Sequence, residues 1–468
     1  MTTTSPRIRT STIARYAVGS IGTGGFGTLP GLVLAIYLTD TLGVAAIWVG
    51  LIIGVAKVWD VLIDPVIGGA SDRSRAASGT RRRFMLLGAA LLPVFFVLTF
   101  AVAPGVGPVA AGIWVGVAFL LAATAFSLFQ VPYITLPAEI VPDYDGRTRL
   151  LSARVVVLTF AILLFGAGGP ELRELFGGST PEGYLGMAIV AGLLLGLGML
   201  VASTAAPREL PTGAPARVSI AAHYAGGIAA LRRSRAFRTL LSTFALQALA
   251  TGMMLAGAAY VAKWVLGDER ATTFLFLALI APALVCAPVW AKIAQRTGKE
   301  WAFGVASMMF GLAALSLVLM LWAPGPWIYV PVGVAGAAYA GMQTLPMAML
   351  PDVISHDARH HGDGRAGVFG GVWTAGETTG MALGAVVLSL VLATTGYQEA
   401  VAGAVVWQGD LAITGIVLSF SVIPAIMIGA SLLTLGRYPL RRIDIDVEAD
   451  AEDAAAENAA DAAAGDAR

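Results

Sequence analysis

Charged residues are scarce in this chain of 468 residues, and cysteine is almost absent. Asp, Glu, Lys and Arg make up 13% of the sequence, against 57% hydrophobic residues, whereas a soluble domain carries about 25% charged residues. This shortage, with a mean hydropathy of +0.78, excludes an ordinary soluble domain and predicts a polytopic membrane protein. The single cysteine, Cys286, excludes a disulfide within the chain. A net charge of +1 gives no indication of nucleic-acid binding.

The long apolar runs define the fold class. Twelve runs are long enough to span a bilayer. They cover about 16–39, 44–68, 84–103, 109–137, 150–169, 184–205, 238–265, 272–294, 301–323, 327–350, 367–394 and 410–435. We therefore expect an all-α polytopic membrane protein with twelve transmembrane helices. Prolines within several runs, and runs longer than about 25 residues, indicate kinked or tilted helices.

Basic residues are distributed unevenly between the two sides of the expected membrane. With the N-terminus in the cytoplasm, nearly all of the 30 Lys and Arg fall on the inner side, and only Arg173 and Arg270 fall outside. Inner loops of membrane proteins are enriched in Lys and Arg. We therefore expect a multi-pass protein of the cell (inner or plasma) membrane with both termini cytoplasmic.

The longest inner loop divides the chain into two sets of six runs. We expect an N-terminal six-helix bundle at 1–205, a central cytoplasmic loop at 206–237 and a C-terminal six-helix bundle at 238–436. A short basic loop after the second run of each set is typical of repeated bundles. The tail at 437–468 is acidic and rich in alanine, which predicts a disordered cytoplasmic segment.

Two acids and a lysine lie in the middle of the second run. Asp60 and Asp64 are four residues apart and lie on one helical face, with Lys57 in the same stripe. An ionised carboxylate in the bilayer centre costs about 2.5–3.5 kcal/mol on insertion scales. Gly50 and Gly54 continue the face and allow close packing. The stripe predicts an ion or proton site facing the protein interior.

Other polar residues within the runs leave alternatives open. Gln130 is a helix–helix hydrogen-bonding residue or a substrate contact, at about even odds. Arg154 can snorkel to the inner surface or reach into a cavity. Glu377 lies about ten residues into the eleventh run, where a functional or ion-paired role is expected. Lys263, near the outer end of the seventh run, is expected to snorkel.

Two motifs carry weak signals. The glycines of Gly22-Thr23-Gly24-Gly25-Phe26-Gly27 match G-x-G-x-x-G, but no strand precedes them, so they indicate helix packing rather than dinucleotide binding. A polar cluster follows the tenth run and consists of His356, Asp357, His360, His361 and Asp363. Its spacing fits metal ligands, but without cysteine a solvated loop is the better interpretation.

Several stretches resemble one transporter family. Lys57-Val58-Trp59-Asp60-x-x-x-Asp64-Pro65-x-x-Gly68, followed by a basic loop, is similar to the second-helix signature of the glycoside–pentoside–hexuronide:cation symporters. Shorter stretches resemble this family too: Gln130-Val131-Pro132-Tyr133, Arg147-Thr148-Arg149-Leu150 with Arg154, and Leu350-Pro351-Asp352-Val353-Ile354. The resemblance covers roughly residues 14–435. It implies the major facilitator fold, with two six-helix bundles.

The resemblance assigns roles position by position. It implies a cation-coupling site of Asp60, Asp64, Ser127 and Lys57, in which Asp60, Asp64 and Ser127 are the ligands if the ion is Na⁺. The expected substrate contacts are Gln130, Tyr133, Arg154, Trp373 and Glu377. The family's sugar-binding acids are missing, because Gly24 and Gln130 occupy their places. Ile63 offers no oxygen to Na⁺ and Lys57 already supplies positive charge, which slightly favours H⁺ as the coupling ion.

The expected function is cation-coupled symport of a small organic solute by alternating access. The solute is expected to be a sugar, glycoside or uronate. Alternatives are a lysolipid or other amphiphile carrier of the same fold, and a membrane sensor that binds a solute without moving it. We expect no enzyme activity, no cofactor beyond the coupling ion H⁺ or Na⁺, and no nucleic-acid partner. The expected partners are the lipid bilayer and the solute, with the chain as a monomer.

Overall fold

The computed structural model describes residues 9–140, 144–207, 229, 231–361, 366–400 and 406–440. Within these residues the elements are all helices. In the first half they are α1 (Thr10–Val18), α2 (Ser20–Ile36), η1 (Tyr37–Thr41), α3 (Ala46–Ser78), α4 (Arg82–Phe100), α5 (Pro108–Ile140), α6 (Tyr144–Leu175) and α7 (Pro181–Ser203). In the second half they are α9 (Arg235–Tyr260), η2 (Val261–Val265), α10 (Ala271–Thr297), α11 (Lys299–Ser316), η3 (Leu317–Leu321), η4 (Pro326–Ile328), α12 (Tyr329–His361), α13 (Ala366–Thr394), α14 (Asp410–Phe420) and α15 (Val422–Leu435).

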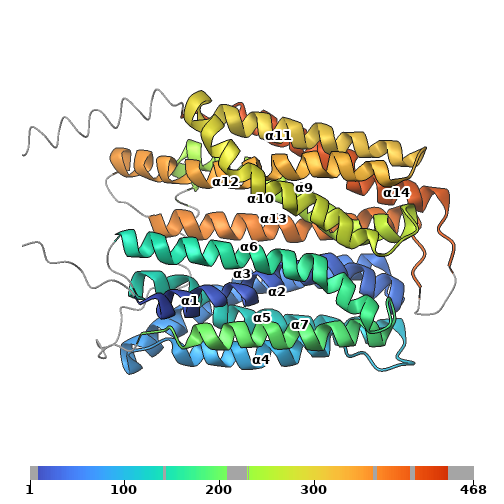
Figure 1. Cartoon of the computed structure of the whole chain (residues 1–468), viewed down its shortest axis with the longest axis horizontal. Coiled ribbons are helices and arrows are strands. Elements are labelled where there is room, and N and C mark those ends of the chain that lie inside the picture. The colour runs from blue at the N-terminus through green and yellow to red at the C-terminus, as the bar shows by residue number, and fades with distance from the viewer. Residues whose placement is uncertain are drawn as a thin grey trace, which may run out of the picture.

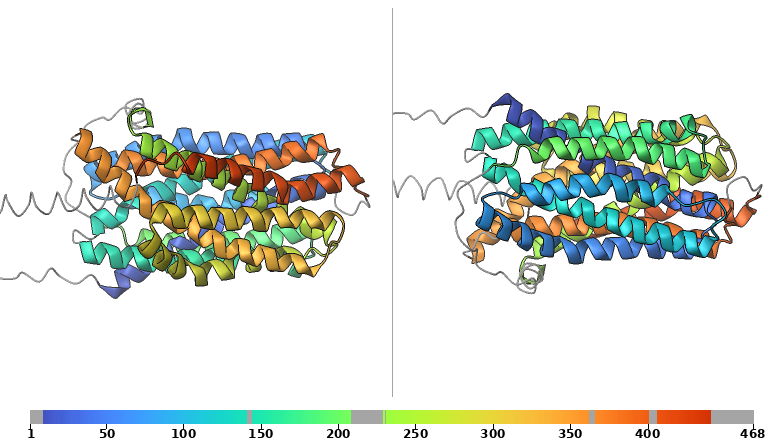
Figure 2. Two further views of the ribbon diagram at one scale, coloured as in Figure 1. Left: turned by 90° about the horizontal axis from the view of Figure 1, so that it is seen from above. Right: turned by 90° about the horizontal axis from the view of Figure 1, so that it is seen from below.

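The helices lie side by side in two groups. Figure 1 shows the first half, α1 to α7, below the second half, α9 to α15, with all long helices roughly along one direction. The two views in Figure 2 show the second-half helices on one side of the molecule and the first-half helices on the other. The spans Thr10–Thr41 and Arg235–Val265 are the most buried, so one central helix of each half faces the other half.

Each expected transmembrane run coincides with a helical segment, apart from a few residues at its ends. Eleven helical segments of the described chain are long and apolar enough to cross a membrane. The tenth run lies in α12, which has membrane-spanning length but many small residues, and Gln343 and Thr344 near its middle lower its apolarity. Pro30, Pro132 and Pro282 lie inside helices, as expected for membrane segments.

The two ends of the bundle differ in the loops and polar contacts found there. We call the end where α1 lies the tail end, and the opposite end, where α14 lies, the far end (Figure 1). At the tail end α3 ends at Gly79, whose φ of 72° is the left-handed conformation that glycine favours.

Some of the expected features lie outside the described residues. These are most of the central loop (208–228 and 230), most of the tail (441–468), Asp363, and the side chains of His360 and His361. No metal-binding cluster is found in the described part of the chain.

The basic residues at the tail end bind acids within their own half. Arg81 pairs with Glu139 of α5 at 2.7 Å, and it also pairs with Asp72 of α3. In the second half, Lys299 pairs with Asp352 of α12 at 2.6 Å. Each pair joins a helix start to a neighbouring long helix, so these basic residues have a structural role.

Glycine allows α9 and α13 to approach very closely. A Cβ added at Gly384 would lie 2.3 Å from Met253 N and 2.4 Å from Leu249 O. One added at Gly252 would lie 2.2 Å from Met381 O. The obstructing atoms belong to the backbone and cannot rotate away. Small residues are thus the means by which these two membrane helices pack, as is common where no hydrophobic effect drives them together.

We expect Gly384→Ala to destabilise the protein by about 1–3 kcal/mol, because the added methyl group must push α9 and α13 apart. The apparent unfolding temperature in detergent should fall by several degrees. Gly370→Ala is the matched control on the same helix, since no atom lies within 4 Å of its added Cβ. Equal unfolding temperatures for both variants would contradict the packing described here.

Candidate functional site

The acid stripe of α3 is only partly neutralised by its own lysine. Lys57 Nζ lies 2.8 Å from Asp60 Oδ2, and the two side chains are 27% and 20% exposed. The pair is formed within one helical turn, as expected from its spacing. The Oδ1 atoms of Asp60 and Asp64 are buried and have no hydrogen-bond partner within the protein. Two buried carboxylate oxygens are therefore available to a cation or a proton.

Helix α5 packs against α3 and contacts its acid stripe. The Ser127 hydroxyl is a hydrogen-bond partner of Asp64. Trp59 Nε1 donates to Thr124 Oγ1 at 2.8 Å, one turn earlier on α5. Two such contacts fix the rotation of α3 against α5. The structure thus brings Lys57, Asp60, Asp64 and Ser127 together, the set expected for cation coupling.

The expected substrate contacts of the first half continue along the same face of α5. Ser127, Gln130 and Tyr133 are spaced by three residues and lie in successive turns. Gln130 Oε1 is buried without a partner. The Arg154 guanidinium, from α6, lies over the Tyr133 ring with its carbon 5.5 Å from the centroid. Arg154 Nε is also buried without a partner, so this face offers both an acceptor and a cation.

Tyr133 is held rigidly by α1 and α2. Its hydroxyl donates to the Tyr16 carbonyl at 2.9 Å and lies 3.1 Å from Ser20 Oγ. The Tyr16 and Tyr133 rings stack with centroids 4.7 Å apart. The ring beneath Arg154 is therefore fixed by three helices. Such a platform can orient the guanidinium without a salt bridge.

The two expected residues of the second half lie on α13. Trp373 is 1% exposed and stacks on Phe244 of α9, with ring centroids 4.4 Å apart. Its Nε1 has no partner within the protein. Glu377, one turn further, lies within electrostatic range of Tyr339 of α12. No ion pair of Glu377 is found among the described residues, which leaves its carboxylate without a fixed countercharge.

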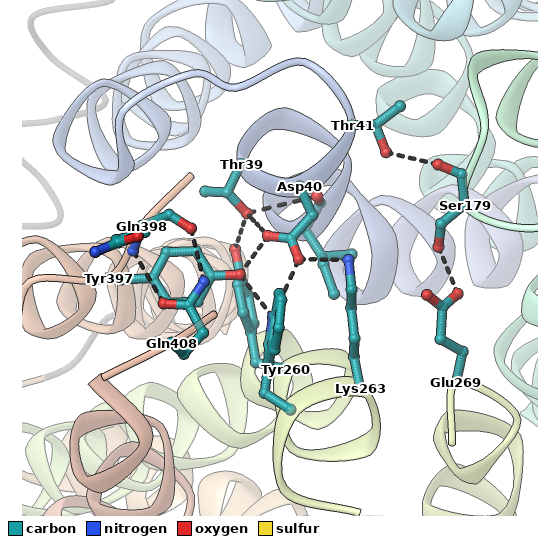
Figure 3. Close-up of polar contacts among 12 residues, drawn as sticks. Thr39, Asp40, Thr41, Ser179, Tyr260, Lys263, Glu269, Tyr397, Gln398 and Gln408 are labelled. Carbon is teal, nitrogen blue, oxygen red and sulfur yellow. Dashed lines mark hydrogen bonds and ion pairs between the residues drawn. The ribbon is translucent and has the colours of Figure 1, made fainter. Parts of the chain in front are cut away.

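A buried carboxylate at the far end joins the two halves. Asp40, in η1, accepts hydrogen bonds from Lys263 Nζ at 2.7 Å and from Trp264 Nε1 at 3.1 Å, both in η2. The Tyr397 hydroxyl, beyond α13, also donates to Asp40 (Figure 3). The Asp40 side chain is 2% exposed. Burial and this neighbouring carboxylate raise the pKa of Tyr397, so the phenol stays protonated and can donate.

Hydroxyl and backbone groups extend this contact. Thr39 Oγ1 lies 2.9 Å from the Tyr260 hydroxyl and donates to Asp40 Oδ1 at 2.7 Å (Figure 3). The Ala400 backbone N–H donates to the Thr39 carbonyl at 2.9 Å. We call Thr39, Asp40, Tyr260, Lys263, Trp264 and Tyr397 the far-end lock. It connects three segments that are far apart in the sequence.

Further polar contacts surround the lock. Arg173 of α6 pairs with Glu269, in the loop before α10, at 2.8 Å. Ser179 donates to the same carboxylate (Figure 3). The backbone N–H of Ala46 donates to Glu399 at 2.9 Å. The halves are thus held in direct contact around the far end, and this end of the bundle is closed.

The sequence did not reveal the lock. The expectation that Lys263 snorkels is wrong, because its ammonium turns inward onto Asp40. Asp40 and Lys263 stand at the outer ends of the first and seventh runs, which are the first runs of each set. An acid and a lysine at equivalent positions of the two repeats were the sequence signal that could have predicted their ion pair.

Comparisons with known proteins place the chain in a family. A family model described as MFS/sugar transport protein matches residues 15–442. The chain belongs to this family. The glucuronide carrier protein homolog of Escherichia coli (strain K12) is 24% identical to this transporter over 446 residues, covering 92% of each chain. The sodium-dependent lysophosphatidylcholine symporter 1 of Xenopus tropicalis is 26% identical over 472 residues, covering 91% of this transporter and 86% of the relative.

The fold agrees with this membership. A crystal structure of a D-xylose–proton symporter matches this transporter with a TM-score of 0.67 at 14% identity, covering 92% of this chain and 98% of the other. The expected major facilitator fold is confirmed, and the resemblance to the glycoside–pentoside–hexuronide:cation symporters is borne out. The chain is a multi-pass membrane transporter.

Breaking the far-end lock should open the far end. Thr251 lies within α9, between its midpoint and the far-end lock. In a Cys286→Ser, Thr251→Cys background, we expect Lys263→Met to raise the rate at which a membrane-impermeant thiol reagent, added on the far side, labels this cysteine. The increase should be about tenfold, since a hydrogen bond to a charged group contributes about 1.5–3 kcal/mol. Lys299→Met, which breaks a tail-end pair, is the control. Labelling that is no faster for Lys263→Met than for Lys299→Met would show that the lock does not hold this end closed.

Proposed function

We propose that this transporter couples the entry of a small polyhydroxylated solute, a sugar, glycoside or uronate, to a cation. The observation that carries the proposal is the pair of unpartnered carboxylate oxygens of Asp60 and Asp64. They lie on α3, while Ser127 and Gln130 lie one turn apart on the neighbouring α5. The ion site and the solute site thus share one helix face. A change in the charge of either acid therefore alters the electrostatic environment of the groups that bind the solute.

The coupling ion follows from the charges around the acids. Lys57 already neutralises Asp60, so a single further positive charge at Asp64 balances the stripe. A proton supplies that charge without further ligands. Na⁺ needs several oxygens, for which Asp60, Asp64 and Ser127 are the available ligands. We keep H⁺ as the slightly favoured ion and Na⁺ as the alternative.

Alternating access gives the far-end lock its place in the transport cycle. We propose that bundles at 1–205 and 238–436 rock about the midplane site, and that the loop at 206–237 and the tail at 437–468 lie in the cytoplasm. The tail end, rich in Arg and Lys, is then the inner side. The far end faces outward, and the locked arrangement is the outward-closed state. In this state the solute site is reached from the cytoplasm.

The relative from Xenopus tropicalis makes a lysolipid carrier the second candidate. An acyl chain needs an apolar cavity, whereas the unpartnered groups of Gln130 and Arg154 suit a hydroxylated or anionic solute. Counterflow in proteoliposomes, with sugars, uronates and lysophosphatidylcholine as separate probes, distinguishes these two candidates. It also tests transport itself, because a sensor that only binds would show no counterflow.

Neutralising either acid should uncouple transport. We expect Asp60→Asn and Asp64→Asn to abolish accumulation against a gradient in vesicles driven by an imposed pH or Na⁺ gradient. Exchange of solute down its own gradient should survive, because the rocking motion does not need the ion. Asp410→Asn, at the exposed start of α14, is the control. Parental accumulation in both acid variants would assign the acids to a structural pairing with Lys57.

Removing the polar groups of the α5 face should weaken solute binding. We expect Arg154→Ala and Gln130→Ala to raise the dissociation constant about tenfold or more, while expression persists, because each loses a hydrogen-bonding group of the site. Calorimetry on purified protein measures this. Lys292→Ala, an exposed tail-end lysine, is the control for loss of positive charge. Unchanged affinity in both site variants would reduce Gln130 and Arg154 to helix-packing residues.

A further inference from the structure

A small pocket in the second half lies between α9 and α12, halfway along α9. Its polar lining consists of Gln247 and Thr251 from α9 and Tyr339 and Gln343 from α12. Phe244 and Met342 supply apolar lining. None of the polar residues belongs to the site assigned above. Phe244 connects the pocket to that site, because its ring stacks on Trp373.

The amide of Gln247 is held in one orientation. Its Nε2 donates to Ser307 Oγ at 2.9 Å and to Ser431 Oγ at 3.1 Å. Both serines use their own hydrogens on backbone carbonyls, at 2.7 Å each. The serine oxygens can therefore only accept, and both hydrogens of the amide are committed to them.

The other end of this amide has no partner. Gln247 is 2% exposed, and its Oε1 is buried without a hydrogen-bond partner. A buried acceptor left unpaired is destabilising and rare in folded proteins. Because Nε2 is fixed on the serines, Oε1 is the end of the amide left for the pocket that Gln247 lines. This arrangement presents an acceptor to a donor that the protein itself does not supply.

Tyr339 supplies the complementary group. Gln343 Nε2 donates to the Tyr339 hydroxyl oxygen at 2.5 Å. The phenol oxygen therefore acts as an acceptor toward Gln343 and keeps its own hydrogen for a further partner. Thr251 has already used its hydrogen within α9, on the carbonyls of Gln247 and Ala248. The pocket thus offers the Tyr339 hydrogen as donor and Gln247 Oε1 as acceptor.

This combination fits an alcohol group. A hydroxyl donates one hydrogen bond and accepts others, so it can satisfy Gln247 and Tyr339 together. A carboxylate cannot donate to Gln247, and an acyl chain would leave both groups unpaired. We propose that Gln247 and Tyr339 form a hydroxyl-binding subsite of the second half, which takes the end of the solute remote from Arg154. The proposal rests on the function proposed above and narrows its substrate to solutes with a hydroxyl at that end.

The subsite gives the solute a contact with each half. Arg154 and Gln130 hold one end on the first half, while Gln247 and Tyr339 hold the other end on the second half. A solute without the distal hydroxyl would leave two buried groups unpaired. Specificity based on such unpaired groups is strong, because a site built to hydrogen-bond a hydroxyl rejects the analogue that lacks it.

The test compares the parent with Tyr339→Phe, which removes only the donating hydroxyl. A panel of hexoses, pentoses, hexuronates and methyl glycosides is first screened by thermal shift, and the best binder is then compared with its monodeoxy analogues by calorimetry. Tyr339→Phe should weaken the best binder about tenfold. It should leave unchanged the affinity of the one deoxy analogue that lacks the bound hydroxyl. Tyr329→Phe, at the far-end start of α12, is the matched control.

Gln247→Met tests the acceptor. Like Tyr339→Phe, it should weaken binding of the best binder and leave unchanged the affinity of the one deoxy analogue that lacks the bound hydroxyl. Should its loss of two serine contacts unfold the chain, Tyr339→Phe still decides the matter. Parental affinity of Tyr339→Phe for the full panel, or an equal loss for every deoxy analogue, would overturn the subsite alone. A parent that binds and exchanges no hydroxylated solute in the panel would overturn the proposed function, and the subsite with it.

Discussion

The arrangement of this transporter depends on how carboxylates are neutralised in a medium of low dielectric constant. An ionised acid within a membrane helix is costly unless a countercharge or hydrogen-bond donors reach it. Asp40 meets this requirement completely, with Lys263 and three further donors around one carboxylate. Asp60 meets it in part, through Lys57. Asp64 has only the Ser127 hydroxyl, so we propose that its charge is the one balanced by a mobile cation.

Because the acids are neutralised to different degrees, Asp40 has a structural role, whereas Asp64 is proposed to take part in ion coupling. Asp40 is satisfied only while the two halves touch at the far end, so its lock stabilises one arrangement of the bundles. In the proposed transport cycle, Asp64 is neutralised only when an ion or proton is bound, so solute binding depends on that ion. Asp40 lies next to groups of the opposite half, and Asp64 lies next to the groups that we propose bind the solute. Movement of the halves and occupancy of the site can therefore influence each other.

The proposed solute site is divided between the halves in a similar way. The first half offers Arg154 above Tyr133, which is fixed by Tyr16 and Ser20. The second half offers the neutral groups of Gln247 on α9 and Tyr339 on α12, and α9 packs on α13 through Gly252 and Gly384. A solute that contacts both halves stabilises the arrangement in which they are close. This is how binding energy can drive a rocking motion.

The sequence predicted the membrane helices and the acid stripe well, for a physical reason. Apolar runs and residue spacing along one helix are local properties, and they place Asp60 and Asp64 on one face before any packing is known. The lock could not be derived in this way, because Asp40 and Lys263 are 223 residues apart and a lone lysine at a helix end suits snorkelling equally well. Gln247 gave no signal at all. Its significance depends on two serines from α11 and α15 that commit its amide hydrogens.

The most direct test of the central claim is the charge that moves when solute binds. Parent protein and Asp64→Asn, both in proteoliposomes on a solid-supported membrane, receive a pulse of the best-binding solute with no ion gradient imposed. If a cation at Asp64 enters with the solute, the parent gives a transient inward current. Asp64→Asn should bind the solute but give no current. Equal currents in the two proteins would contradict the account and place the coupling charge elsewhere.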